Sequence, residues 1–196
     1  MDMTETNIPD LRPLLALALD QTGALITGTA PESAGAPTPC AEYDVAGLIG
    51  HLQGVVRRIG LVVAQRPLEP MATGWPIADR TAHWESGRAG TDAALATADL
   101  QARVKVPWGE VSVAQALGSY VSELAVHGWD LAAATGRVDQ LDPALAEAAL
   151  PAAVAKIPAE PRGGFIPFGP VVPVPDDAPA YDRLLGWTGR DPGWTP

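Results

Sequence analysis

The segment VAQALGSYVSELAVHGWDLAAATG, residues 113–136, is apolar almost throughout and predicts one long helix over residues 113–135. Gly136 is a suitable C-terminal stop for this helix. Glu123 and His127 stand four residues apart in it, which places their Cβ atoms about 5–6 Å apart on one helix face. A carboxylate in so apolar a segment is costly to bury unless a cation or hydrogen-bond donors meet it.

Three other segments carry helical periodicity. We expect a helix over residues 10–27, a second that begins after an N-cap at Asp44 and ends before Pro67, and a weaker third over residues 77–98. Between the third and fourth helices, residues 103–113 alternate around Pro107 and Gly109, which predicts a small β-hairpin. The fold class we predict is therefore mainly all-α, a four-helix bundle with one hairpin.

The remainder of the chain has a different texture. Of the 20 prolines, 11 fall in residues 137–196, so this part cannot be one long helix. We divide the chain into a bundle, residues 1–136, and a short proline-rich C-terminal extension, residues 137–196, which packs on the bundle without being an independent domain. Pro143 should open a short helix that Pro151 kinks or ends, and residues 181–187 should add a last helical turn or two. Four aromatic side chains are expected to hold the extension in place: Phe165, Phe168, Trp187 and Trp194.

Composition restricts the possible partners. Apolar residues make up 47% of the 196, charged residues 18%, and the net charge is −10, values that indicate a globular protein and disfavour nucleic acid as a ligand. No run approaches the ~20 apolar residues of a membrane span. With one cysteine and no recognisable secretion signal, the expected location is the cytoplasm. The sequence is compatible with a homo-oligomer and does not define one.

His51 completes a candidate metal site. It lies at the edge of the apolar stripe of the second helix, as Glu123 does in the fourth, and edge positions on two helices can face each other across a bundle. Two histidines and one carboxylate match a catalytic zinc with an open position, or another first-row metal. The simpler alternative is that Glu123 and His127 hydrogen-bond each other and that His51 is an ordinary core-edge histidine.

Two more residues are candidates for supporting roles. Arg58 follows His51 by seven residues, about 10 Å along the same helix, and would bind a substrate carboxylate there or act as a surface arginine. Asp130 follows His127 by three and would support a metal ligand or be a solvated aspartate. Whether Arg190 and the aromatic residues of the extension reach the site is left open by the sequence.

Three segments resemble a known family. They are ELAVHGWDL at 123–131, PTPCAEYDV at 37–45 running into LIGHL at 48–52, and LLGWTGRDP at 184–192. The first resembles the metal-binding helix of the DinB-like superfamily, in its mycothiol-dependent maleylpyruvate isomerase branch, and the last resembles actinobacterial members. The resemblance implies a DinB-like four-helix bundle in which His51, Glu123 and His127 bind a divalent ion, zinc most often and nickel in some members.

The resemblance also implies a chemistry. A divalent metal lowers the pKa of a coordinated thiol or water, so a small-molecule thiol such as mycothiol would serve as nucleophile and no protein cysteine would be needed. The leading hypothesis is a thiol-dependent metalloenzyme of isomerase or S-transferase type that acts on a small electrophilic substrate. A metal-dependent hydrolase and a non-catalytic ligand-binding bundle are the alternatives. The short extension does not match the separate C-terminal domain of the isomerase.

Overall fold

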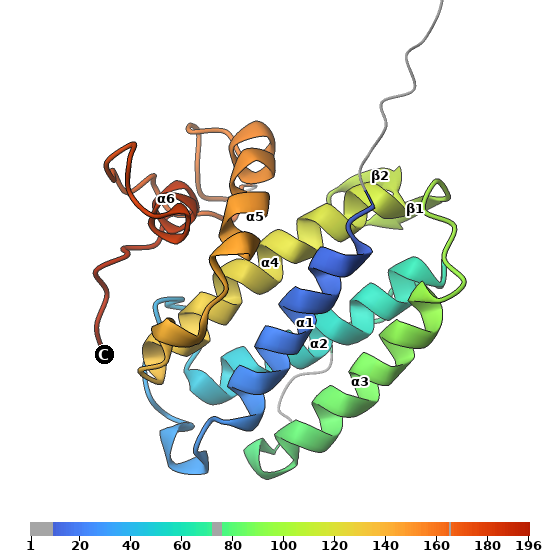
Figure 1. Ribbon diagram of the computed structural model, residues 1–196, viewed down its shortest axis with the longest axis horizontal. Coiled ribbons are helices and arrows are strands. Elements are labelled where there is room, and N and C mark those ends of the chain that lie inside the picture. Colours follow the sequence, from blue (N-terminus) through green and yellow to red (C-terminus); the bar gives the residue numbers. More distant parts are fainter. Residues whose placement is uncertain (1–9, 72–75, 165) are drawn as a thin grey trace, which may run out of the picture.

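Four helices form the body of the molecule (Figure 1). The computed structural model describes residues 10–71, 76–164 and 166–196. The bundle consists of α1 (Arg12–Thr27), α2 (Val45–Val63), α3 (Arg80–Leu95) and α4 (Val113–Ala134). Helix α1 packs on α3 and α4, and α2 packs on the same two helices, so within the bundle each helix has two principal neighbours. The predicted mainly α-helical bundle is confirmed.

The element boundaries follow local sequence signals closely. Asp44 caps α2, because its carboxylate accepts a hydrogen bond from the Gly47 amide at 2.8 Å. Ser112 and Gln115 form a reciprocal capping box at the start of α4. The third helix differs from its prediction, because a 3-10 turn at Ile77–Asp79 precedes α3, which already ends at Leu95.

The predicted hairpin is present and leads directly into α4. Strands β1 (Arg103–Val106) and β2 (Gly109–Ser112) pair antiparallel, and Gly109 adopts a φ of 141° at the turn. Such a backbone angle strains any residue with a side chain, which explains the glycine. Because Ser112 ends the strand and also caps the helix, the hairpin fixes where α4 begins.

Helix α2 is a core helix. Among the described residues it is the one helix apolar and long enough to cross a membrane by length and composition, with a mean hydropathy of 1.2 over its most apolar window. Of that window, 61% is buried inside the bundle. The side chains of Leu48, Leu52, Val56 and Ile59 are fully covered. Burial on several sides accounts for the composition of this helix.

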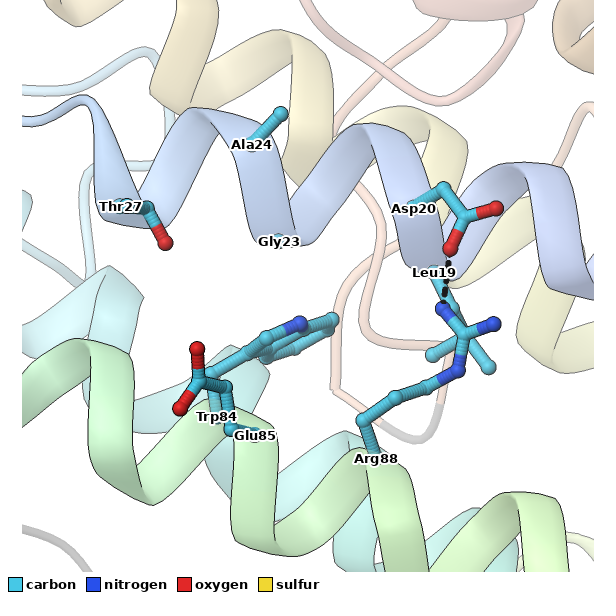
Figure 2. A pocket seen from close by; sticks show the side chains of 8 residues that line it. All are labelled: Leu19, Asp20, Gly23, Ala24, Thr27, Trp84, Glu85 and Arg88. Atoms are coloured by element: carbon cyan, nitrogen blue, oxygen red, sulfur yellow. Dashed lines mark hydrogen bonds and ion pairs between the residues drawn. The ribbon is translucent and has the colours of Figure 1, made fainter.

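Helix α3 is held against α1 by close packing around Gly23 (Figure 2). The indole ring of Trp84 lies directly under Gly23, and a Cβ atom at that position would collide with its Nε1. At one end of the shallow groove between the two helices, Arg88 pairs with Asp20 at 2.6 Å. This aromatic contact and this ion pair therefore contribute to holding α3 against α1, while α3 also packs on α2.

The extension contributes two helices, α5 (Pro143–Lys156) and α6 (Ala180–Trp187), which lie on the α4 side of the bundle (Figure 1). Pro151 does not end α5, which continues five residues beyond it. Leu145, Ala149 and Ala153 of this helix are buried, and such packing offsets one missing backbone hydrogen bond. Trp187 donates its indole N–H to the Ala153 carbonyl at 3.1 Å. Phe168 and Trp194 are half-buried, and Phe165 lies outside the described residues.

Candidate metal centre

The contact between α2 and α4 brings three predicted ligands together. His51 Nε2 lies 3.0 Å from Glu123 Oε1, and His127 Nε2 lies 3.7 Å from the same oxygen. The two imidazole rings meet edge to face, with centroids 4.7 Å apart. The three ligand atoms all lie within 4.8 Å of one another. The packing of α2 against α4 therefore places one nitrogen of each imidazole close to the same carboxylate oxygen of Glu123.

These separations suit a divalent ion. Zinc–nitrogen and zinc–oxygen bonds of about 2.0–2.1 Å at tetrahedral angles place neighbouring ligand atoms about 3.3 Å apart. The observed distances of 3.0 and 3.7 Å lie on either side of that value. Two imidazoles and one carboxylate also leave at least one coordination position for a water or another ligand. The donor set fits a catalytic zinc or a related first-row metal.

His127 is held in place by a buried carboxylate. Its Nδ1 lies 2.9 Å from Asp130 Oδ2, and Asp130 is 0% exposed. Because a carboxylate accepts hydrogen bonds, the proton of the neutral imidazole belongs on Nδ1, and the lone pair on Nε2 faces Glu123 and His51. This is the tautomer that a metal ligand requires, and a carboxylate on the far nitrogen is the usual support for a zinc-bound histidine.

The C-terminal extension supplies the counter-charge for Asp130. Arg190 donates from its terminal nitrogen to Asp130 Oδ2 at 3.1 Å and from Nε to Oδ1 at 3.3 Å. Burial lowers the pKa of Arg190, but the charge and hydrogen bonds of Asp130 outweigh burial and raise it. Asp130 thus receives donors from a metal-ligand candidate and from a residue 60 positions further along the chain.

His51 has a different support. The ring of Tyr43, in the loop before α2, stacks on the imidazole with centroids 5.1 Å apart and planes inclined by 28°. The Tyr43 hydroxyl lies 3.4 Å from His51 Nδ1, while His51 Nε2 faces Glu123. The stacked tyrosine limits rotation of the His51 imidazole. Each histidine of the cluster therefore has a neighbour that fixes its orientation, Tyr43 for His51 and Asp130 for His127.

The carboxylate of Glu123 is ionised in this setting. Burial raises its pKa, but the hydrogen bond with His51 and the electrostatic interactions with His127, His51 and Arg190 outweigh burial and lower the pKa to about 2. The side chains of His51 and His127 are 15% and 12% exposed, whereas that of Glu123 is 38% exposed. A small molecule can therefore approach the cluster from the Glu123 side.

Cys40 lies near His127 and Asp130 but lacks the lowered pKa of a reactive cysteine. Its sulfur lies within 4.8 Å of ligand atoms of His127 and Asp130. Burial raises the pKa of the thiol, and the charge of Arg190 offsets only part of that effect. A buried thiol kept protonated is a poor nucleophile.

The structure also shows what the sequence left undecided or did not indicate. Asp130 is a buried partner of His127 and not a solvated aspartate. Glu123 makes its shorter contact with His51 across the bundle, not with His127 in its own helix. Arg58 is half-buried and, in the part of the chain that the structure describes, forms no hydrogen bond or ion pair with the three ligand candidates. Arg190 reaches the site, and no sequence spacing relates it to Asp130.

Comparison with known proteins agrees with this architecture. The family model described as mycothiol maleylpyruvate isomerase N-terminal domain matches residues 15–132. Proteins of Mycobacterium tuberculosis named only as uncharacterized, from two strains, are each 35% identical over 180 residues, 91% of this chain and 97% of the relative.

Two solved structures share the fold. The crystal structure of the mycothiol-dependent maleylpyruvate isomerase superposes with a TM-score of 0.59 at 15% identity, covering 74% of this chain and 67% of that one. A histidine-to-alanine mutant of the isomerase gives a TM-score of 0.55 at 14% identity over the same shares. The match to the family model covers more than half of the chain, and it includes all three ligand candidates. The chain belongs to the family of the mycothiol maleylpyruvate isomerase N-terminal domain.

Proposed function

We propose that this protein binds one divalent metal ion, zinc in preference to nickel, through His51, Glu123 and His127, and uses it in a mycothiol-dependent reaction on a small electrophile. The observation that carries the proposal is the convergence of three ligand atoms within 4.8 Å, one of them on a histidine held in the metal-binding tautomer by a buried aspartate. The family to which the chain belongs supports mycothiol as the thiol.

Each residue of the site has a distinct part in this proposal. The bound ion would lower the pKa of a thiol at its open position and so supply a thiolate at neutral pH. Asp130 keeps the proton of His127 on Nδ1, and Arg190 holds Asp130 in place through two hydrogen bonds. Tyr43 covers the outer face of the His51 ring. The partly exposed Glu123 marks the side from which thiol and substrate enter.

The chemistry that follows depends on the electrophile. Addition of the thiolate to a conjugated double bond, rotation about the resulting single bond and loss of the thiol give isomerisation, whereas a substrate with a leaving group gives S-transfer. The protonated, buried Cys40 is consistent with a thiol that comes from solution. We place the reaction in the cytoplasm, because a free cysteine and a thiol cofactor both suit a reducing compartment.

The first test is metal content. Elemental analysis of untagged protein should find about one equivalent of zinc per chain, lost in a His127→Ala variant and kept in a His83→Ala variant, which alters the one remaining histidine, on α3. Equal metal content in all three proteins, or none even after zinc is added, would refute the proposed centre. The His83→Ala control separates loss of a ligand from loss of any histidine.

The second test addresses the thiol. In cobalt-substituted protein, mycothiol should produce a sulfur-to-cobalt charge-transfer band, which reports direct coordination without any assay of turnover. Activity toward a panel of electrophiles and esters, measured with and without mycothiol, then separates thiol chemistry from hydrolysis. Turnover of esters without thiol and the absence of the cobalt band would favour a metal-dependent hydrolase.

A further inference from the structure

Two buried polar atoms lie close to the metal cluster without a hydrogen bond. The Tyr120 hydroxyl on α4 and the Nε of Arg58 on α2 are both covered, and neither has a hydrogen-bond partner among the described residues. Tyr120 as a whole is only 3% exposed. Nearly all buried polar side-chain atoms in folded proteins are paired, so two unpaired donors from neighbouring helices need an explanation.

The two side chains are close enough to influence each other. Burial raises the pKa of Tyr120 to about 12, while the positive charge of Arg58 lowers it and the negative charge of Glu123 raises it further. Tyr120 therefore remains a neutral hydrogen-bond donor at every physiological pH. Arg58 forms no ion pair with the acidic residues in the described part of the chain, so its charge is not neutralised by a carboxylate of the protein.

The pair lies next to the ligand candidates. Tyr120 precedes Glu123 by three residues and is its neighbour on α4. Arg58 follows His51 by seven residues, about 10 Å along α2. Since Glu123 faces His51 and the charge of Arg58 acts on Tyr120, the two helices run in opposite directions and place this pair one to two turns from the cluster.

We propose that Arg58 and Tyr120 form an anion-binding subsite, which receives a carboxylate of the small molecule whose other end lies at His51, Glu123 and His127. A guanidinium and a hydroxyl offer two kinds of donor and one positive charge, and a planar guanidinium matches a carboxylate with two parallel hydrogen bonds. That the bound molecule also reaches the metal centre rests on the proposed function, whereas the affinity of Arg58 and Tyr120 for an anion does not.

The β-hairpin contacts this subsite at Tyr120. Trp108, at the turn between β1 and β2, meets the Tyr120 ring edge to face with centroids 5.8 Å apart, and remains 52% exposed. The Tyr120 hydroxyl is covered, and exclusion of water from it would strengthen a hydrogen bond to a bound carboxylate.

The test is a binding titration with simple dicarboxylates. Isothermal titration calorimetry of the zinc-loaded protein should detect malonate, succinate or glutarate and give no comparable heat with succinamide, the uncharged diamide of succinate. Tyr120→Phe should weaken binding about tenfold, as expected for one hydrogen bond to a charged group, and Arg58→Gln should weaken it more. Arg57→Gln serves as the matched control. It removes the same charge from the preceding position of α2, which is exposed.

The Tyr120→Phe variant also tests whether weaker dicarboxylate binding could result from misfolding. Removal of a buried hydroxyl without a partner should leave the melting temperature of the ligand-free protein unchanged or raise it. Weaker binding with undiminished stability is the combination that a purely structural tyrosine would not produce. Equal affinity in the wild type and both variants, a diamide bound as well as succinate, or no dicarboxylate binding at all would overturn the inference.

The same samples distinguish the two proposals. If zinc is absent but the metal-free protein still prefers succinate over succinamide through Arg58, the anion subsite stands and the metal-dependent function fails. If zinc binds stoichiometrically and no variant changes dicarboxylate binding, the subsite fails and the metal centre stands.

Discussion

Replacement of Asp130 by asparagine is the most informative single change, because it alters the support of His127 and leaves all three ligand candidates in place. Asp130 Oδ2 accepts hydrogen bonds from His127 Nδ1 at 2.9 Å and from Arg190 at 3.1 Å, while Oδ1 accepts the Arg190 Nε at 3.3 Å. Asparagine keeps only one oxygen. Its amide nitrogen must face either Arg190 alone or both donors, so at least one hydrogen bond is lost.

The magnitude follows from burial. Asp130 is 0% exposed and the Arg190 side chain 13%, so the variant leaves a buried cation without its counter-charge. Loss of one partner from a buried ion pair costs about 3–5 kcal/mol of stability. For zinc, loss of the carboxylate behind a ligating histidine lowers affinity about 10- to 100-fold, or about 1.4–2.7 kcal/mol. If the amide nitrogen turns toward His127, the imidazole proton is driven to Nε2 and the loss approaches the upper value.

Two measurements check this prediction. Urea unfolding of the metal-free proteins gives the change in stability, and competition with a chromogenic chelator gives the change in zinc affinity. Asp139→Asn, an exposed aspartate on the following turn, should stay within about 0.5 kcal/mol of the wild type. A double variant with Arg190→Gln should be less destabilised than the sum of the single changes. Asp130→Asn with wild-type zinc affinity would show that Asp130 does not orient His127.

Two further predictions concern the bundle itself. Because burial raises the folded-state pKa of Tyr120 to about 12 from an unfolded value of 10, the hydroxyl ionises first in the unfolded state, and the free energy of unfolding falls as the pH rises from 10 toward 12. That loss amounts to about 2–3 kcal/mol, and it should be absent from Tyr120→Phe in urea unfolding at successive pH values; parallel curves would contradict it. Gly23→Ala should cost about 1–3 kcal/mol, since its methyl group collides with the Trp84 indole, whereas Gly35→Ala, with nothing within 4 Å, should be nearly neutral. Equal melting temperatures for these two variants would contradict the close α1–α3 contact.

The fold was largely predictable because its signals are local. The helical period of α2 and α4, the Asp44 cap and the glycine after α4 each depend on residues within one or two turns, and the structure has these elements where they were expected. The weaker period of the third helix hid the 3-10 turn at its start. Pro151 suggested an earlier end of α5 than the structure shows. Burial of α5 against α4 is a tertiary effect that outweighs a local helix breaker.

The sequence indicated three side chains that the structure brings together, but not how they are arranged. Spacing places Glu123, His127 and Asp130 on one helix, but which of them faces His51 depends on how α2 crosses α4, and no local pattern contains that angle. The support from Arg190 is still less accessible, since 60 residues separate it from Asp130. Tyr43 was part of a quoted family-like segment, yet only the folded loop places its ring on His51.

The extension is therefore more than a cover for one side of the bundle. The family model ends at residue 132 and includes His51, Glu123, His127 and Asp130, but the cation that balances Asp130 comes from residue 190. A carboxylate with no exposed surface, such as that of Asp130, is costly to bury unless a partner charge accompanies it. Displacement of Arg190 would therefore leave Asp130 without its counter-charge and without two hydrogen bonds, which would weaken its hold on His127. The geometry of the metal-ligand candidates inside the bundle is thus coupled, through one buried ion pair, to the docking of the C-terminal extension.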